Sequence, residues 1–498
     1  MPLRHLVVIL VAVSWCWTTL TVTEASLLQN IVSWIQPIQR LWDNILSRFL
    51  LFQRLGQKSI CYDLIGCFHV QGAFSHFRQV PEPPNFLKTE LWVCTNHFPN
   101  PVDSSTQLLD YHNSSKGSVF QPGRPIKVLV HGYGGHIKSS KIIAAKNAFL
   151  QRRGAGGKYR RAVENAELVG RQAGKILLRL IANGTHPSDI HVIGFSLGAQ
   201  VAGFIGETFK QYGFKLGQIT GLDPASLLFE SRMLPAYRRL DHSDADYVEV
   251  IHTDGSRIWS DGFGLLTPVG HVDYFPNGGI DQPGCKDTFL DVLAFGLNNN
   301  ANSSGVCSHG RSWDIFLEML TSPHCQFVGF SCPGLKNFRR DFLHGNCFQS
   351  CNENSSTCGV FGHRSLAAGA LYFVTRHSKP YCGQQLKAAV MISPTTYVTR
   401  GVLSLKLFHE SGSTDFLLGS LTSNVIVGGR EMSAVVAAEP GSISVEETPI
   451  ITVSISFVPS HAVYFTLWQT CRNNLLLESS TGEFPANVII ELSLEPCL

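Results

Sequence analysis

The sequence predicts an α/β domain followed by an all-β domain. Between residues 126 and 252, apolar strand-like runs alternate with helix-like runs. This order is typical of a mostly parallel sheet with helices on both faces. From residue 396 onward no helical period is visible, and apolar residues alternate with Thr and Ser, most strictly at 451–457. Such short alternating runs predict a β-sandwich.

Length and charge agree with two domains and exclude one class of partner. The 498 residues exceed what one ordinary core organises. The 40 Lys and Arg against 37 Asp and Glu leave a formal charge of +3. Proteins that bind nucleic acid carry a strongly basic surface, so we expect no nucleic-acid partner.

The N-terminus predicts secretion into the extracellular space. Residues 1–25 combine Arg4, an apolar run over 6–17 and a small residue, Ala25, as a cleaved signal peptide does. The apolar run is too short to span a bilayer. The 14 cysteines fit an oxidising compartment. Loss of Cys16 with the signal leaves an odd number, so at least one thiol is free or pairs outside the chain.

Residues 26–60 form an amphipathic N-terminal extension. Apolar residues recur there at three- and four-residue spacing, as in a helix, with a break at Pro37. One interpretation is a helix that lies on a lipid surface. The other is a propeptide, or a helix that packs on the next domain.

The spacing of apolar residues predicts the elements of the α/β domain in order along the chain. A buried-type strand over 126–130 ends in His131-Gly132-Tyr133, and a helix over 162–182 shows one apolar face. A strand over 190–193 and a helix over 199–210 come next, and strands over 216–221 and 247–252 follow.

Between the strand over 190–193 and the helix over 199–210 stands Gly194-Phe195-Ser196-Leu197-Gly198. A strand, Gly-x-Ser-x-Gly and a helix make a nucleophile elbow, in which the serine sits on a strained turn and glycines allow close backbone approach. Ser196 is therefore a candidate nucleophile. The Leu197 N–H, at the helix start, is placed to stabilise an oxyanion.

A serine nucleophile needs a base and an acid that orients it. Asp223 follows the strand over 216–221 and precedes Pro224, which suits the acid. For the base, spacing alone leaves His309, His271 and His252 open.

Several motifs, in this order, resemble the pancreatic lipase family: residues 194–199, 221–225, 252–255 and 270–279, with Cys285 and Cys307 bracketing a loop before His309. The resemblance runs from Cys61 to Cys497. It implies an α/β-hydrolase domain over 61–392 and a PLAT-type β-sandwich over 393–498. It also implies a triad of Ser196, Asp223 and His309, and an oxyanion hole from the backbone N–H groups of Tyr133 and Leu197.

The loop between Cys285 and Cys307 resembles the family's lid. It holds 21 residues with an apolar set: Phe289, Leu290, Val292, Leu293, Phe295 and Leu297. A lid that uncovers the site on lipid would explain activation at an interface. Its length resembles the lids of triacylglycerol lipases, whereas the phospholipase A1 branch has shorter ones.

The resemblance also implies a calcium loop and further disulfides. Asp241 and Asp244 would supply carboxylate oxygens, and Ala236 and Arg239 main-chain carbonyls, all suited to Ca²⁺; the alternative is a solvated turn. The implied disulfides are Cys61–Cys67, Cys332–Cys347, Cys351–Cys358 and Cys471–Cys497. Cys94, Cys325 and Cys382 have no counterpart in that pattern.

One departure concerns the sheet. The family has a further buried strand between the oxyanion strand and the elbow helix. Here residues 144–150 run directly into a basic, glycine-rich segment over 151–161. We expect a core strand near 150–152 to be missing, which would leave the strand over 126–130 without one of its two neighbours and weaken the fold.

Together these features predict a secreted, calcium-binding lipase that hydrolyses ester bonds of neutral glycerides at a lipid–water interface. Phospholipase A1 activity is the first alternative. The second is a catalytically impaired, lipid-binding member of the family, because of the missing strand. The sequence leaves open whether a colipase-like or lipoprotein partner binds.

Overall fold

The computed structural model describes parts of both predicted regions. The residues that it describes are 59–69, 80–87, 91–92, 108–109, 125–133, 159–182, 184–230, 234–255, 262–287, 306–322, 324–332, 338–348, 351, 355–392, 399–400, 402–409, 412–418, 425–427, 429–439, 452–458, 463–466, 475–477, 481–484 and 490–496. The predicted signal peptide and amphipathic extension, except for Ser59 and Ile60, lie outside these residues.

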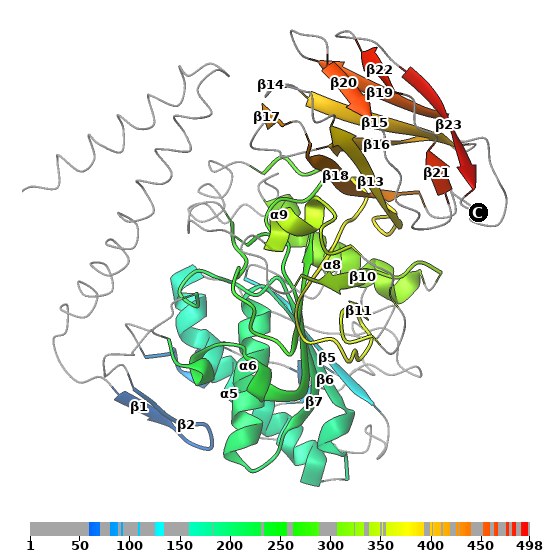
Figure 1. Ribbon diagram of the computed structural model, residues 1–498. Helices are drawn as coiled ribbons and strands as arrows, with labels where there is room; N and C mark the ends of the chain where they lie inside the picture. Colours follow the sequence, from blue (N-terminus) through cyan, green and yellow to red (C-terminus); the bar gives the residue numbers. More distant parts are fainter. Residues whose placement is uncertain are drawn as a thin grey trace, which may run out of the picture. The chain divides into compact units, whose positions relative to one another are not determined.

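In the part of the chain that the structure describes, the central sheet has eight strands, in the order β11-β10-β12-β9-β8-β7-β6-β5 (Figure 1). Their bounds are β5 Ile126–Val130, β6 Ile190–Phe195, β7 Leu216–Leu222, β8 Ala245–Ile251, β9 Val272–Pro276, β10 Val328–Ser331, β11 Cys358–Val360 and β12 Gly369–Phe373. Neighbours from β5 to β12 pair in parallel, and β10 pairs antiparallel with β11 and β12. This mixed sheet with its helices shows the α/β class and is consistent with an α/β hydrolase.

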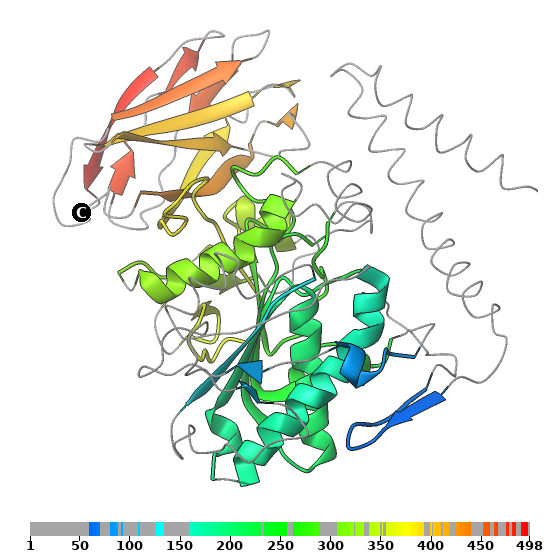
Figure 2. The same ribbon diagram turned by 180° about the vertical axis from the view of Figure 1, so that it is seen from behind.

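Helices cover both faces of the sheet. On β6, Val192 shares a buried cluster with Phe204 of α6 (Leu197–Gln211) and Leu177 of α5 (Tyr159–Ala182). The next residue, Ile193, shares a second cluster with Trp313 of α8 (Cys307–Thr321). Because successive strand residues point to opposite faces, α8 lies on the other side of the sheet from α5 and α6 (Figures 1 and 2).

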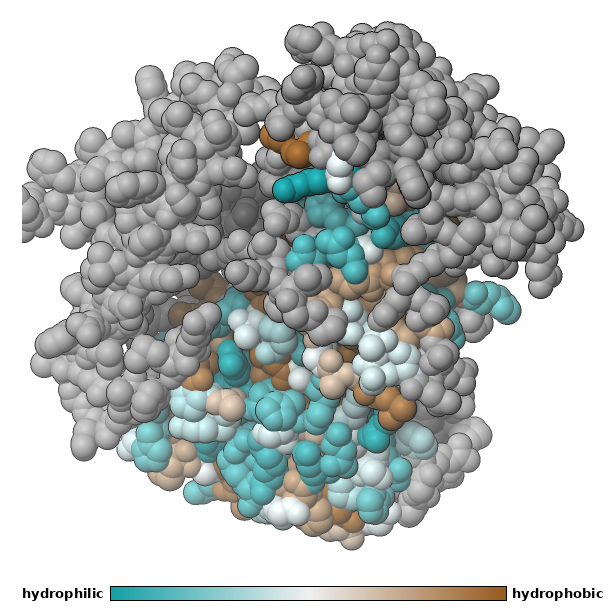
Figure 3. Space-filling view, in the orientation of Figure 1, coloured by the Kyte–Doolittle hydropathy of each residue, from teal (hydrophilic) through white to brown (hydrophobic). Residues whose placement is uncertain are grey.

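The outward surface of the helical layer is mainly polar. In the described part of Figure 3, hydrophilic residues prevail over α5 and α6, and hydrophobic ones are scattered among them. Within the described residues, every helix falls short of the length and apolarity that crossing a bilayer requires.

Shorter elements and disulfides complete this region. The elements are β1 Ser59–Tyr62, β2 Gly66–His69, α3 Pro84–Leu87, β3 Leu91–Trp92, β4 Leu108–Leu109, η3 Pro187–Asp189, η4 Ala236–Arg238, η5 His242–Asp244 and α9 Phe338–Leu343. Four disulfides implied by the resemblance are present: Cys61–Cys67, Cys285–Cys307, Cys332–Cys347 and Cys351–Cys358. A fifth, Cys325–Cys382, joins two cysteines that had no expected partner. Cys94, Cys471 and Cys497 lie outside the described residues.

The C-terminal region is all-β, as the alternating pattern predicts. One sheet has the order β18-β13-β20-β22, another β16-β15-β19-β23-β21, and β14 pairs with β17. The bounds are β13 Gln384–Ile392, β14 Thr399–Arg400, β15 Val402–His409, β16 Gly412–Leu418, β17 Val425–Ile426, β18 Glu431–Ala438, β19 Thr452–Val458, β20 Val463–Thr466, β21 Leu475–Leu477, β22 Thr481–Phe484 and β23 Ile490–Pro496. Since β13 pairs with β18 and β20, the all-β region begins at Gln384, ahead of the expected boundary at 392/393.

Strand β5 ends the central sheet in the order of the described strands. Among the described strands β5 pairs with β6, and Val128 lies opposite Val192. The segment where we expect a strand to be missing lies almost wholly outside the described residues. Only its last three residues are described, and they belong to α5, which begins at Tyr159. The missing strand stays a prediction.

A chain of polar side chains crosses the sheet from β5 to β8. Lys127 Nζ lies 2.8 Å from His191 Nδ1, and His191 Nε2 lies 2.8 Å from Thr220 Oγ1. The Thr220 hydroxyl donates to Glu249 Oε1 at 2.8 Å. An ammonium group only donates, so His191 accepts at Nδ1 and donates at Nε2. Burial lowers the pKa of His191 well below its ordinary value and raises the pKa of Glu249 to about 7.

Candidate active site

The turn between β6 and α6 holds Ser196 in a strained conformation. Its backbone has φ 56° and ψ −122°, a region that L-residues other than glycine rarely adopt. The Ser196 N–H donates to the Leu222 carbonyl at 2.9 Å, and the Ser196 carbonyl accepts from the Ala199 N–H at 3.0 Å. This strained serine between a strand and a helix is the geometry of a nucleophile elbow.

Glycines allow the loop after β5 to lie against this turn. A Cβ on Gly132 would lie 2.8 Å from the Ser196 Cβ, and one on Gly198 would lie 2.3 Å from the Val130 carbonyl oxygen. Side chains at either position would therefore push the two segments apart. Next to them, Leu197 opens α6, so its N–H belongs to the first turn, where backbone donors lack partners within the helix.

Asp223 follows β7 and is fully buried. Its Oδ1 accepts hydrogen bonds from the Thr253 N–H at 2.7 Å and the Asp254 N–H at 3.2 Å. Its Oδ2 lies 2.6 Å from His309 Nδ1. The two backbone donors fix the carboxylate, and the carboxylate in turn fixes the imidazole ring.

His309 is the histidine that meets Asp223, out of the three that spacing leaves open. It stands in the first turn of α8, with the Phe195 ring centroid 4.8 Å and the Phe263 centroid 5.5 Å from its own. Because Nδ1 faces the carboxylate, Nε2 is the nitrogen left for proton transfer with Ser196, which follows Phe195 in the chain.

The other two histidines hold structural hydrogen bonds. His252 is buried between the Leu265 carbonyl and the Asp273 carboxylate, each within 2.9 Å of a ring nitrogen. His271 Nδ1 accepts from the Val248 N–H at 2.9 Å.

Asp254 is a buried carboxyl group beside the Asp223–His309 pair, to which the sequence assigns no role. One oxygen or ring nitrogen of each of the three residues lies within 4.8 Å of the others. Burial and the negative charge of Asp223 hold the pKa of Asp254 well above its ordinary value. Burial therefore disfavours a second negative charge on Asp254 beside Asp223. The position of Asp254 in the 252–255 motif is the sequence feature that could have pointed to it.

Gly264 lies against the Asp223 carboxylate, and its role was not predicted from the sequence. It forms β-bridges with Ala225 and Gly255. A Cβ there would lie 2.3 Å and 2.4 Å from the two carboxylate oxygens of Asp223. Only a glycine, with a hydrogen in place of a side chain, fits at this position. A single glycine in a long loop does not reveal this requirement in the sequence.

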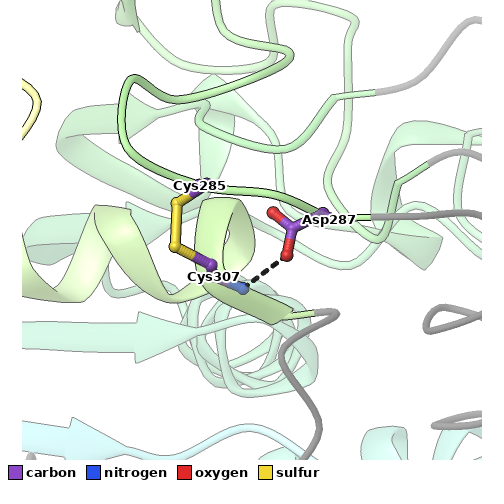
Figure 4. Close-up of side chains that lie close together, drawn as sticks. All are labelled: Cys285, Asp287 and Cys307. Carbon is purple, nitrogen blue, oxygen red and sulfur yellow. Dashed lines mark hydrogen bonds between the residues drawn. A yellow bond between two sulfur atoms is a disulfide. The ribbon is translucent and has the colours of Figure 1, made fainter.

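The base of the predicted lid is tied to the helix that carries His309. The Cys285–Cys307 disulfide is formed, and Figure 4 shows the Asp287 carboxylate beside it. Asp287 accepts from the Cys307 N–H at 2.9 Å and the Ser308 N–H at 2.7 Å, so it caps α8 from outside the helix. With both sulfurs in a disulfide, this cluster has no thiolate to offer a metal. Of the predicted lid, the 21 residues between Cys285 and Cys307, residues 288–305 lie outside the described residues.

The expected calcium loop contains η5. Asp241 Oδ1 accepts from the Ser243 N–H at 2.6 Å, while its buried Oδ2 receives no hydrogen bond from any described residue. Burial, with the nearby Asp241, raises the pKa of Asp244 to about 8. Asp241 and Asp244 are buried acids, and Asp241 Oδ2 is still able to accept, so the pair suits a hard cation. However, Lys210 Nζ already lies 2.9 Å from Asp244 Oδ1.

The chain is similar to known lipases. A family model described as Lipase matches residues 58–381. Pancreatic triacylglycerol lipase of Homo sapiens is 32% identical over 334 residues, which cover 63% of this chain and 68% of the relative. Pancreatic triacylglycerol lipase of Myocastor coypus is 31% identical over 335 residues, covering 63% and 70%. A Mus musculus protein named inactive pancreatic lipase-related protein 1 is 31% identical over 391 residues, covering 74% and 79%. The chain belongs to the pancreatic lipase family.

Proposed function

We propose that this protein is a secreted carboxylic ester hydrolase that acts on neutral glycerides at a lipid–water interface. The observation that carries the proposal is the 2.6 Å contact between His309 Nδ1 and Asp223 Oδ2, beside a serine held at φ 56°. A nucleophile, a base and an orienting acid are what ester hydrolysis through an acyl-enzyme requires.

In the proposed reaction, His309 Nε2 takes the proton from Ser196 as the serine oxygen attacks the ester carbonyl carbon. The backbone N–H groups of Tyr133 and Leu197 stabilise the oxyanion that forms. The imidazolium then gives its proton to the leaving alcohol, which departs and leaves an acyl-serine. Water, deprotonated by the same nitrogen, releases the fatty acid and restores the serine.

The electrostatic arrangement supports this assignment of roles. Asp223 is buried and accepts two backbone N–H groups, so its charge stabilises the imidazolium that forms next to it. Burial and the neighbouring Asp223 hold the pKa of Asp254 well above its ordinary value, which disfavours a second negative charge beside His309.

The proposed substrate class follows from the lid. The 21 residues between Cys285 and Cys307 resemble the lids of triacylglycerol lipases in length. An apolar lid that moves onto a lipid surface would admit a long acyl chain. A PLAT-type β-sandwich, the form we propose for the all-β region from Gln384 onward, would add a second surface for lipid.

A structural calcium ion is a further part of the proposal. The carboxylates of Asp241 and Asp244, with the main-chain carbonyls of Ala236 and Arg239, would hold it. The ion would supply positive charge to two buried acids and takes no part in the hydrolysis.

A second candidate function is lipid binding without catalysis. Two relatives are named inactive pancreatic lipase-related protein 1, at 31% and 30% identity. In this chain the Asp223–His309 contact is present, which favours the enzyme. Phospholipase A1 activity is disfavoured by the lid length.

The test is hydrolysis by the purified secreted protein and its Ser196→Ala variant. We expect triolein emulsions to be cleaved faster than phosphatidylcholine vesicles under matched interfacial conditions. We expect the variant to lose at least about a thousandfold in rate with its fold intact. Equal activity in the folded variant would refute the nucleophile, and lipid binding without turnover by the unaltered protein would favour the second candidate. A preference for phospholipid would assign phospholipase A1 activity.

A further inference from the structure

A cation of the chain itself, the Lys210 ammonium, lies against the expected calcium loop. Lys210 stands in the last turn of α6, and its ammonium lies 2.9 Å from Asp244 Oδ1 and 2.8 Å from Glu207 Oε2. It also donates to the Ser243 hydroxyl at 2.7 Å. Three oxygens therefore surround the nitrogen, and two of them come from the η5 turn.

Close backbone packing fixes the helix against this turn. A Cβ on Gly206 would lie 2.3 Å from the Asp244 carbonyl oxygen, and one on Gly203 would lie 2.7 Å from the Leu240 Cα. The helix cannot slide without a clash, so the lysine stem starts from a fixed point one turn further along the same helix face. Asp244 has no exposed side-chain surface, whereas Lys210 retains 27%. The Asp244 carboxylate is thus buried, and the partly exposed Lys210 side chain brings the counter-charge to it.

The ammonium and a calcium ion compete for one oxygen. A calcium ligand must offer its oxygen at about 2.4 Å, and Asp244 Oδ1 already faces Lys210. The second carboxylate oxygen, Oδ2, accepts the Asp241 N–H at 3.0 Å within the turn. Calcium therefore binds beside a positive charge or displaces it.

We propose that Lys210 is a built-in cation of the η5 turn: it holds the turn folded without metal and lowers its affinity for calcium. The lysine neutralises Asp244 and stays bound because it is covalently attached. A doubly charged ion about 5 Å from the ammonium is repelled even in water, which weakens binding by about tenfold or more. This inference concerns metal affinity and folding, and it stands apart from the proposed hydrolysis.

The test compares the unaltered protein with Lys210→Met, which removes the charge and keeps most of the stem. Lys215→Met is the matched control, because Lys215 makes a half-exposed pair with Asp246 at 3.8 Å outside the turn. Each metal-stripped protein is titrated with CaCl₂ by calorimetry, and its unfolding temperature is measured with EGTA and with about 1 mM CaCl₂, a concentration that fills extracellular calcium modules.

We expect calcium to raise the unfolding temperature of the unaltered protein and of Lys215→Met by less than that of Lys210→Met. Lys210→Met should unfold at a lower temperature in EGTA, recover with calcium, and bind calcium at least about tenfold more tightly. Equal calcium affinity in Lys210→Met and the unaltered protein would overturn the proposal. If Lys210→Met does not fold, Lys210→Gln replaces it in the same titrations, and the same results support or overturn the proposal.

Discussion

Replacing Gly264 by alanine tests the active site at a residue that takes no part in the reaction. The added Cβ would lie 2.3 Å from Asp223 Oδ1 and 2.4 Å from Oδ2. The Asp223 backbone is confined, because its N–H donates to the Ile251 carbonyl at 2.8 Å and its φ is 43°. We therefore expect the carboxylate to turn away from Gly264 rather than the two backbones to separate.

The size of the effect follows from the distances. A carbon and an oxygen in contact need more than 3 Å, so the carboxylate must shift by about 1 Å. The hydrogen bond to His309, now 2.6 Å, then exceeds the length at which it holds the ring. A displacement of this size costs about a hundredfold in rate, and complete loss of the acid costs about ten-thousandfold. We expect Gly264→Ala to fall between these limits in kcat, with KM little changed.

The assay is hydrolysis of a soluble short-chain ester, which avoids any contribution from lid or interface. Gly213→Ala is the matched control: its φ of +77° also disfavours alanine, but a Cβ there meets no atom within 4 Å. It should lower the unfolding temperature and keep the rate. A folded Gly264→Ala protein with full activity would show that Asp223 does not orient the base.

Three further predictions test other contacts. Asp223→Asn should reduce kcat by about ten-thousandfold, because the amide stabilises the wrong tautomer of His309; a near-normal rate in the folded variant would exclude Asp223 as the acid. Asp287→Ala removes the cap on α8 and should lower stability by about 1 kcal/mol and reduce kcat, with Asp287→Asn intermediate, as urea unfolding and ester hydrolysis would show; unchanged values would contradict the capping role. Burial raises the pKa of Glu249 from 4.5 to about 7. The fold therefore prefers the protonated acid, and its contribution to stability is complete below pH 4.5 and lost as pH rises through 7. The free energy of unfolding of the unaltered protein, relative to Glu249→Gln, should fall by about 3 kcal/mol across that window; a constant difference in urea titrations would refute this.

The elements that place Ser196 were predictable because their signals are local. The apolar run before Gly194 and the helical spacing after Gly198 predict a strand and a helix, and both are present as β6 and α6. The strained turn follows from the same five residues. Likewise, strict alternation after residue 396 indicates strands without any knowledge of what they pack against. The pairing of β13 with β18 and β20 could not be predicted in this way, because pairing between strands leaves no local signal in the sequence.

The choice of base could not follow from spacing. His309 is 86 residues from Asp223 in the chain. Whether they meet depends on the order of strands β7, β8 and β9 and on which face α8 covers. His252 comes nearer in sequence, yet its ring is held by Leu265 and Asp273 on neighbouring segments. Only the resemblance to a family, which carries the topology with it, separated the candidates.

Lys210 shows where the limit of sequence reasoning lies. Gly203, Gly206 and Lys210 recur at helical spacing, so the sequence does place them on one face of α6. Two glycines on one helix face predict that another backbone packs closely there. The lysine one turn later does not show whether that backbone carries an acidic residue. The acid is Asp244, 34 residues further on, and it reaches this face because strands β7 and β8 lie side by side. A helix face can thus be predicted from its own residues, whereas the charge it meets is fixed by the sheet order.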